Sequence, residues 1–204
     1  MHIVIKSSQE QKNALATFLL NVVASLTWID GNDPIPDADI YFDCCFEKDG
    51  YTFPMITQQP VFVNAVVAFG ESIPTNCIRF NGWSGFLHES SIEIASSNSN
   101  MLNQGVQLLT KINKKALIAP DQPGMVSARV VAMIINEAYY ALGEAISTKK
   151  DIDIAMKLGT NYPFGPFEWS EKIGLKNIYS LLQKLNESST RYAIAPAMLE
   201  ELNQ

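Results

Sequence analysis

The segment between residues 147 and 175 constrains the fold more than any other, because it predicts two short helices joined by a rigid turn. The turn reads Tyr162-Pro163-Phe164-Gly165-Pro166, and its prolines fix φ on either side of a glycine. Ser147 or Thr148 can cap the first helix, whose opening turn carries acids, and Pro166 suits the start of the second. The first helix has apolar residues at helical spacing, and Gly159 is expected to end it. These residues are Ile152, Ala155, Met156 and Gly159.

The rest of the C-terminal half also has helical periodicity. A long helix is predicted over 126–145, and further helices over 101–111, 175–185 and 195–202. A short strand or extended run is predicted at 116–119. The polar break at 98–103 is a natural helix start, so we expect an all-helical domain over 99–204.

The N-terminal half alternates between strand and helix patterns. A strand at 2–5, a helix at 9–23 and a strand at 25–30 form a βαβ unit, which pairs its strands in parallel. Apolar runs predict further strands at 39–47 and 60–67. Residues 1–98 are therefore expected to form a mostly parallel sheet with reduced helical cover.

The first turn of this βαβ unit bears on cofactor binding. A dinucleotide fold has G-x-G-x-x-G here, so that bare backbone can approach a pyrophosphate at a helix N-terminus. The chain has Lys6-Ser7-Ser8-Gln9-Glu10, without a glycine, and Glu10 would face the phosphate with like charge. Asp30 follows the second strand, where a ribose-binding acid would lie; without the glycines, a solvated acid before a turn is the favoured interpretation.

Two motifs in the C-terminal half carry a family resemblance. Residues 151–175 read DIDIAMKLGTNYPFGPFEWSEKIGL, and residues 123–129 read PGMVSAR, with NEA at 136–138. Both resemble the C-terminal helical domain of the 3-hydroxyacyl-CoA dehydrogenases, and the N-terminal half resembles that family's nucleotide-binding domain faintly. The resemblance implies a Rossmann-like fold followed by an all-α domain, a homodimer built on the C-terminal helices, and a cleft for an acyl-CoA-like molecule.

The same resemblance locates candidate site residues. Arg79 stands where the family has its acid/base histidine, close to Asn81. Arg79 cannot act as a general base, but it could bind an anion, or it could be an ordinary surface or salt-bridged arginine. Asn64 is retained beside Ala65-Val66-Val67, where the family has hydroxyl side chains. Ala128 replaces an active-site asparagine.

Glu93 matches the family glutamate that orients the histidine, and we expect it to pair with Arg79. His88 lies close in sequence and could replace the missing base, although a lone histidine in such a loop is more often exposed and idle. The implied catalytic candidates are thus Glu93 and His88, and the implied substrate or anion-binding candidates are Arg79, Asn81 and Asn64. Asp30 is the one cofactor-binding candidate.

The composition and net charge of the chain limit the kinds of partner that it could bind. The net charge of −6 argues against a nucleic-acid or anionic-membrane partner. No apolar run has transmembrane length, no basic stretch precedes an apolar one at the N-terminus, and no metal-ligand cluster is evident. The adjacent Cys44 and Cys45 with the distant Cys77 suggest small core residues in a reducing cytoplasm rather than a disulfide framework.

Two functional hypotheses remain open. In the first, the chain has lost NAD binding and hydride transfer and acts as a ligand-binding or dimeric interaction module, because four expected features are replaced together. In the second, it is an active NAD-dependent 3-hydroxyacyl-CoA dehydrogenase with a rearranged site containing Glu93 and His88.

Overall fold

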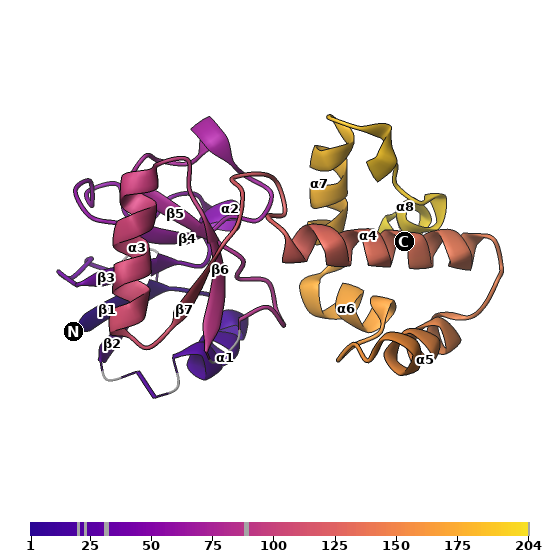
Figure 1. Cartoon of the computed structure of the whole chain (residues 1–204), viewed down its shortest axis with the longest axis horizontal. Helices are drawn as coiled ribbons and strands as arrows, with labels where there is room; N and C mark the ends of the chain where they lie inside the picture. Colours follow the sequence, from indigo (N-terminus) through magenta and orange to yellow (C-terminus); the bar gives the residue numbers. More distant parts are fainter. Residues whose placement is uncertain (20, 23, 31–32, 88–89, 204) are drawn as a thin grey trace. The chain divides into compact units, whose positions relative to one another are not determined.

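The chain folds into two compact units, Met1–Val126 and Ser127–Gln204, which are described separately (Figure 1). The structure, a computed structural model, describes residues 1–19, 21–22, 24–30, 33–87 and 90–203, with the backbone alone at 10, 14 and 17. The sequence suggested a boundary after residue 98. The division falls later because α3 (Ser99–Lys111) packs on the sheet and β7 (Lys115–Ile118) is its last strand.

The first unit is built on one seven-stranded sheet with the order β2-β1-β3-β4-β5-β6-β7. Every neighbouring pair is parallel except β5–β6, which confirms the mostly parallel sheet expected from the sequence. The remaining strands are β1 (His2–Lys6), β2 (Ser25–Ile29), β3 (Ile40–Asp43), β4 (Val61–Asn64), β5 (Cys77–Phe80) and β6 (Ser91–Ala95).

The strand order resembles a dinucleotide-binding sheet with one strand removed. In the usual order 3-2-1-4-5-6, a further strand lies outside the second. Here β2 is the edge, since residues 30–39 connect it to β3 without adding a strand among the described residues.

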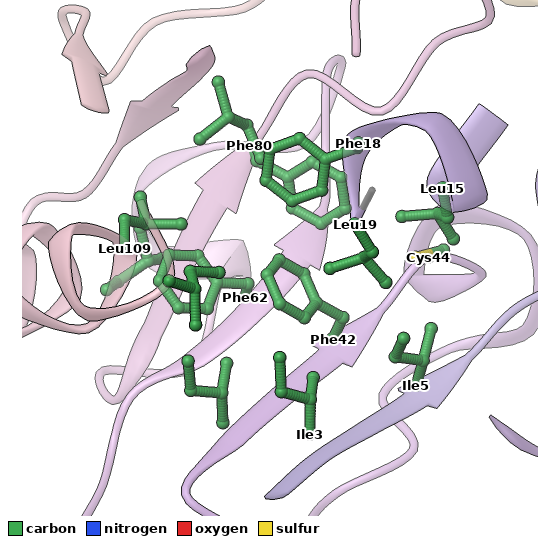
Figure 2. Packing of buried hydrophobic residues seen from close by; sticks show 14 of the residues in the cluster. Ile3, Ile5, Leu15, Phe18, Leu19, Phe42, Cys44, Phe62, Phe80 and Leu109 are labelled. Atoms are coloured by element: carbon green, nitrogen blue, oxygen red, sulfur yellow. The ribbon is translucent and has the colours of Figure 1, made fainter. Parts of the chain in front are cut away.

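Helices cover one face of the sheet and mostly loops cover the other. Under α1 (Gln9–Phe18) and α3, the aromatic rings of Phe42 and Phe62 stack with centroids 4.9 Å apart, beside Ile3 and Leu109 (Figure 2). The opposite face packs against Phe53 and the segments around Ile35 and Ile73, with only the short helices α2 (Phe46–Asp49) and η1 (Gly70–Ser72) nearby. This arrangement is the reduced helical cover that the sequence predicts.

Several elements are shorter than expected, among them α1 and β3. The helix α1 ends at Phe18 rather than Val23, although residues 20 and 23 lie outside the described part. The strand β3 ends at Asp43, and the run predicted to continue to residue 47 turns away. The buried carboxylate of Asp43 accepts hydrogen bonds from the backbone N–H groups of Cys45 (3.2 Å) and Thr52 (2.8 Å), which fixes this turn.

The second unit is all-helical, as predicted. The long helix α4 packs against the other four α-helices. Within it, the buried amide of Asn136 accepts from the N–H of Ala195 (2.9 Å) and donates to the carbonyl of Ala193 (2.8 Å), which holds the approach to α8. The helices are α4 (Ser127–Gly143), α5 (Lys149–Thr160), α6 (Pro166–Ile173), α7 (Leu175–Asn186), the 3-10 turn η2 (Thr190–Tyr192) and α8 (Pro196–Leu202). No described helix of the chain is long and apolar enough to cross a membrane.

The helix–turn–helix at 147–175 is held by one buried carboxylate. Asp153 on α5 accepts from the N–H of Phe167 in the first turn of α6 (2.8 Å), and a side chain on Gly165 would collide with it. Thr148 caps α5 as expected. The helix passes Gly159, however, and ends where Asn161 adopts the left-handed conformation. Ala155 is exposed together with Gly159, so the predicted buried face of α5 was wrong at those two positions.

Candidate functional site

The candidate site in the first unit lies at the carboxyl ends of the parallel strands. The chain passes from β1 to β2 on one side and places β3 on the other. The crevice above β1 and β3 is therefore the topological switch point, where open α/β sheets usually bind ligands.

At this crevice, side chains of the protein bind the free backbone N–H groups at the N-terminus of α1. The hydroxyl of Ser8 accepts from the N–H of Gln11 (3.3 Å), and Oε1 of Gln11 accepts from the N–H of Ser8 (3.0 Å). This reciprocal arrangement is a capping box, which satisfies amides that a phosphate would otherwise contact. When G-x-G-x-x-G is placed from the end of β1, its three glycine positions fall on Lys6, Ser8 and Gln11.

Gln11 also spans the crevice. Its Nε2 donates to the carbonyl of Cys44 at the end of β3 (2.7 Å), and the thiol of Cys45 lies 3.5 Å from its Oε1. A pyrophosphate bound at this turn would meet the Gln11 side chain. The hydroxyl of Ser7 is buried without a hydrogen-bond partner among the described residues, but one hydroxyl does not replace bare backbone amides. The residues present therefore do not fit a dinucleotide bound in the usual way.

Asp30, the ribose-binding candidate, is exposed at the end of β2. Its N–H donates to the carboxylate of Asp33 (2.7 Å), which makes it part of a turn. The solvated interpretation agrees with this placement. The side chain of Glu10 lies outside the described part of the chain.

Arg79 is completely enclosed at the end of β5, with 1% of its surface exposed. Its guanidinium donates to the carbonyls of Ala65 (3.0 Å), Val66 (3.2 Å) and Gln122 (3.2 Å). It also pairs with the carboxylate of Asp121 at 2.5 Å. Burial lowers the pKa of Arg79, and Asp121 opposes that shift. The side chain joins the loop after β4 to the segment that precedes α4.

The predicted ion pair between Arg79 and Glu93 was wrong. Asp121 takes the place of Glu93, whose Oε1 instead accepts from the N–H of Val126 (2.9 Å). Glu93 is close enough to stabilise the charge on Arg79. No pattern in the sequence pointed to Asp121, which lies 42 residues away in a segment without a recognised motif.

Asn64 and Asn81 are buried in the same region and bind backbone. Asn64 donates to the carbonyl of Cys44 (3.2 Å) and accepts from the N–H of Gly82 (2.9 Å). Asn81 accepts from the N–H of Trp83 (3.1 Å). Substrate binding by Asn64 or Asn81 stays a prediction. Asn64 joins the segments that follow β3 and β5, whereas the bond from Trp83 to Asn81 belongs to a local turn.

The other candidates are located differently. His88 lies outside the described residues. Ala128 is buried in α4 of the second unit and contributes only a methyl group. Cys44, Cys45 and Cys77 are buried free thiols, and burial raises the pKa of all three, that of Cys77 to about 11. No group of metal-binding side chains occurs among the described residues.

The second unit has a surface pocket of its own, of about 610 Å³, beside the turn of its helix–turn–helix. Lys157 pairs with Glu168 there, and the ammonium of Lys172 lies 4.6 Å from the centre of the Phe164 ring. Opposite charges balance in this pocket, so it shows no preference for an anion or a cation.

The comparisons with known proteins divide along the two units. Residues 124–204 match the family model described as 3-hydroxyacyl-CoA dehydrogenase, C-terminal domain. The 3-hydroxyadipyl-CoA dehydrogenase of Escherichia coli is 44% identical over 82 residues, covering 40% of this chain and 17% of that protein. The probable 3-hydroxybutyryl-CoA dehydrogenase of Bacillus subtilis is 35% identical over 107 residues, covering 52% of this chain and 37% of that protein. The chain thus spans well under half of the length of these relatives.

Solved structures extend the likeness to the whole fold. The (S)-3-hydroxybutyryl-CoA dehydrogenase of Ralstonia eutropha matches with a TM-score of 0.74 at 16% identity, over 99% of this chain and 93% of that one. FadB2 of Mycobacterium tuberculosis matches with a TM-score of 0.77 at 11% identity, over 98% and 93%. At such identities the likeness concerns the fold alone.

The class follows from these observations: a Rossmann-like sheet unit followed by a helical unit, as in dehydrogenases of this architecture. Residues 124–204 match the C-terminal domain of the 3-hydroxyacyl-CoA dehydrogenase family, as the sequence motifs indicated.

Proposed function

We propose that this 3-hydroxyacyl-CoA dehydrogenase-like protein lacks normal NAD binding and hydride transfer, and acts as a dimeric ligand-binding or interaction module. The observation that carries the proposal is the Gln11 side chain, which caps α1 and bonds across the switch point to the carbonyl of Cys44. A dinucleotide would have to displace these hydrogen bonds and would find side chains where it needs bare amides.

The residue at the position of the acid/base histidine supports the same proposal. General-base catalysis needs a group that can accept a proton near neutral pH, and a guanidinium does not lose its proton there. The guanidinium of Arg79 also donates hydrogen bonds to Asp121 and to three backbone carbonyls. It therefore serves structure in this proposal, and an acyl-CoA-like ligand would bind through other groups.

The proposal also includes dimerisation of the protein and its location in the cell. The second unit exposes apolar side chains on α5 and in the turn after it. Leu158 is 83% exposed, and Ile154 on the same helix and Tyr162 after it are also exposed. Such a surface on a helical domain suits isologous pairing of two copies through the C-terminal helices. Three free, buried thiols suit a reducing compartment, and we place the protein in the cytoplasm.

The alternative is an active NAD-dependent dehydrogenase with a rearranged site. The similar proteins favour this alternative, since they are named as dehydrogenases of 3-hydroxyacyl-CoA compounds. The N–H of Val126 holds Glu93 near Arg79, so a carboxylate is present at the position that corresponds to the family's active site. In this alternative NAD is the cofactor, and Glu93 or His88 would accept the proton of the substrate hydroxyl.

Calorimetry with NADH separates the two functions. We expect no heat of binding for the wild-type chain. A variant with Lys6, Ser8 and Gln11 all changed to glycine restores the usual turn, and it should bind NADH measurably if side chains are what exclude the cofactor. Micromolar NADH affinity of the wild-type protein would contradict the proposal.

An activity assay gives the second readout. NADH absorbance is followed with acetoacetyl-CoA for wild type, Glu93→Ala and His88→Ala. Loss of a general base typically removes about 10²–10⁴ of rate, so we expect no turnover above background in any of them. Wild-type turnover that disappears in Glu93→Ala would establish the alternative, and loss in His88→Ala would identify the migrated base.

A further inference from the structure

The outer edge of β2 has no described strand beside it. The strand order begins with β2, and the described residues form no additional strand of the kind that usually lies outside this position. A strand that is normally internal has thereby become an edge, which exposes a row of backbone hydrogen-bonding groups.

The direction of these groups follows from the pairing with β1. The N–H of Ser25 donates to the carbonyl of Met1 (3.0 Å), and the two strands run parallel. Since successive residues of a strand point their backbone groups to opposite sides, Thr27 also bonds toward β1. The N–H and C=O groups of Leu26 and Trp28 therefore point outward. Two residues thus present two donors and two acceptors along the edge.

The sequence of β2 lacks the usual protection against strand pairing. It reads Ser-Leu-Thr-Trp-Ile, without a charge or a proline, and Leu26 is 39% exposed. At the other end of the sheet, β7 carries Lys115 and is followed within two residues by Pro120. Charged residues and prolines are the features by which proteins protect exposed edges. The unprotected edge is thus β2.

We propose that β2 pairs antiparallel with β2 of a second copy of this chain, across a twofold axis at Thr27. In this register Leu26 of each copy lies opposite Trp28 of the other, and their outward groups form four hydrogen bonds. Trp28 packs against the core under α1, and Leu26 shares that face because it lies two residues away. The pairing therefore places apolar side chains together and continues the sheet into the second copy.

A second copy fits this edge because the strand is complementary to itself. Leucine and tryptophan flank the central threonine, so reversal of the strand brings each beside the other, and the strand has no charge that could repel its copy. Asp30 stays outside the paired residues in this register. The proposal is independent of pairing through the C-terminal helices. With both interfaces present, the assembly would be larger than a dimer, because each copy would pair through two separate surfaces.

Leu26→Pro tests the pairing by its backbone. Proline at this position removes an outward N–H and blocks a neighbouring strand, but leaves the bonds from Ser25 and Thr27 to β1. Leu26→Val is the matched control, because it keeps both the N–H and a strand-forming side chain. Light scattering over a concentration series should show Leu26→Pro at a lower mass than the wild type, with Leu26→Val unchanged.

Leu158→Glu, measured beside these variants, separates this inference from the proposed helical interface. If both interfaces form, the wild type is larger than a dimer, each single variant is a dimer, and the double variant is monomeric. If only the β2 pairing forms, the wild type is a dimer that Leu158→Glu leaves intact. A wild-type mass that Leu26→Pro does not change overturns the inference.

Hydrogen exchange of the wild-type protein decides the matter even if Leu26→Pro fails to fold. The amides of Leu26 and Trp28 should be protected, and the protection should rise with protein concentration. Exchange of these two amides at the rate of an unstructured peptide at every concentration also overturns the inference.

Discussion

Replacing Asp121 with asparagine should destabilise the first unit by about 3 kcal/mol. Arg79 is 1% exposed and its carboxylate partner 16%, at a distance of 2.5 Å. Removing one partner of a buried ion pair costs about 3–5 kcal/mol, because the remaining charge stays buried. The three carbonyls that also accept from Arg79 keep part of its solvation, which places the estimate at the lower end of that range. Asparagine preserves the shape and one acceptor oxygen.

Urea denaturation followed by tryptophan fluorescence measures this change. A Trp169→Phe background removes the signal of the second unit and leaves Trp28 and Trp83, which report on the first. The midpoint should fall without a change in slope, and thermal unfolding should occur roughly 10 °C lower.

The double variant Arg79→Met with Asp121→Asn is the control. It removes the buried charge together with its partner, so it should be more stable than Asp121→Asn alone. A loss below about 0.5 kcal/mol in Asp121→Asn would refute the reasoning, since surface changes produce effects of that size.

Two further predictions concern other parts of the chain. Gly165→Ala should unfold or strongly destabilise the second unit, because its Cβ would lie 2.3–2.5 Å from atoms of Asp153; the loss of Trp169 fluorescence on milder denaturation checks this. Cys44 and Cys77 should react slowly with a thiol reagent at pH 8 in the folded protein and rapidly in urea, because burial raises the pKa of both thiols; rapid labelling of the native state would contradict it.

The sequence by itself determined the class of fold and the family resemblance of the C-terminal domain. Alternating apolar patterns identified the βαβ start and the long helix α4, because burial imposes a period on each element that is readable locally. The motif at 151–175 identified the helical domain, and its constraint is short-range, since Asp153 and Phe167 lie within one helix–turn–helix. The missing glycines at 6–11 were also visible in the sequence. The Ser8–Gln11 capping box could have been recognised from Ser-x-x-Gln before a helix.

Only the tertiary structure decided what the candidate site residues contact. Gln11 reaches the carbonyl of Cys44 because β1 and β3 are neighbours in the sheet, although Gln11 and Cys44 are 33 residues apart along the chain. Arg79 pairs with Asp121 rather than with Glu93 because the segment before α4 returns over the end of β5. Such contacts depend on strand order and register, which no local pattern encodes. For the same reason the first unit extends to Val126, since β7 completes the sheet only after α3 has crossed it.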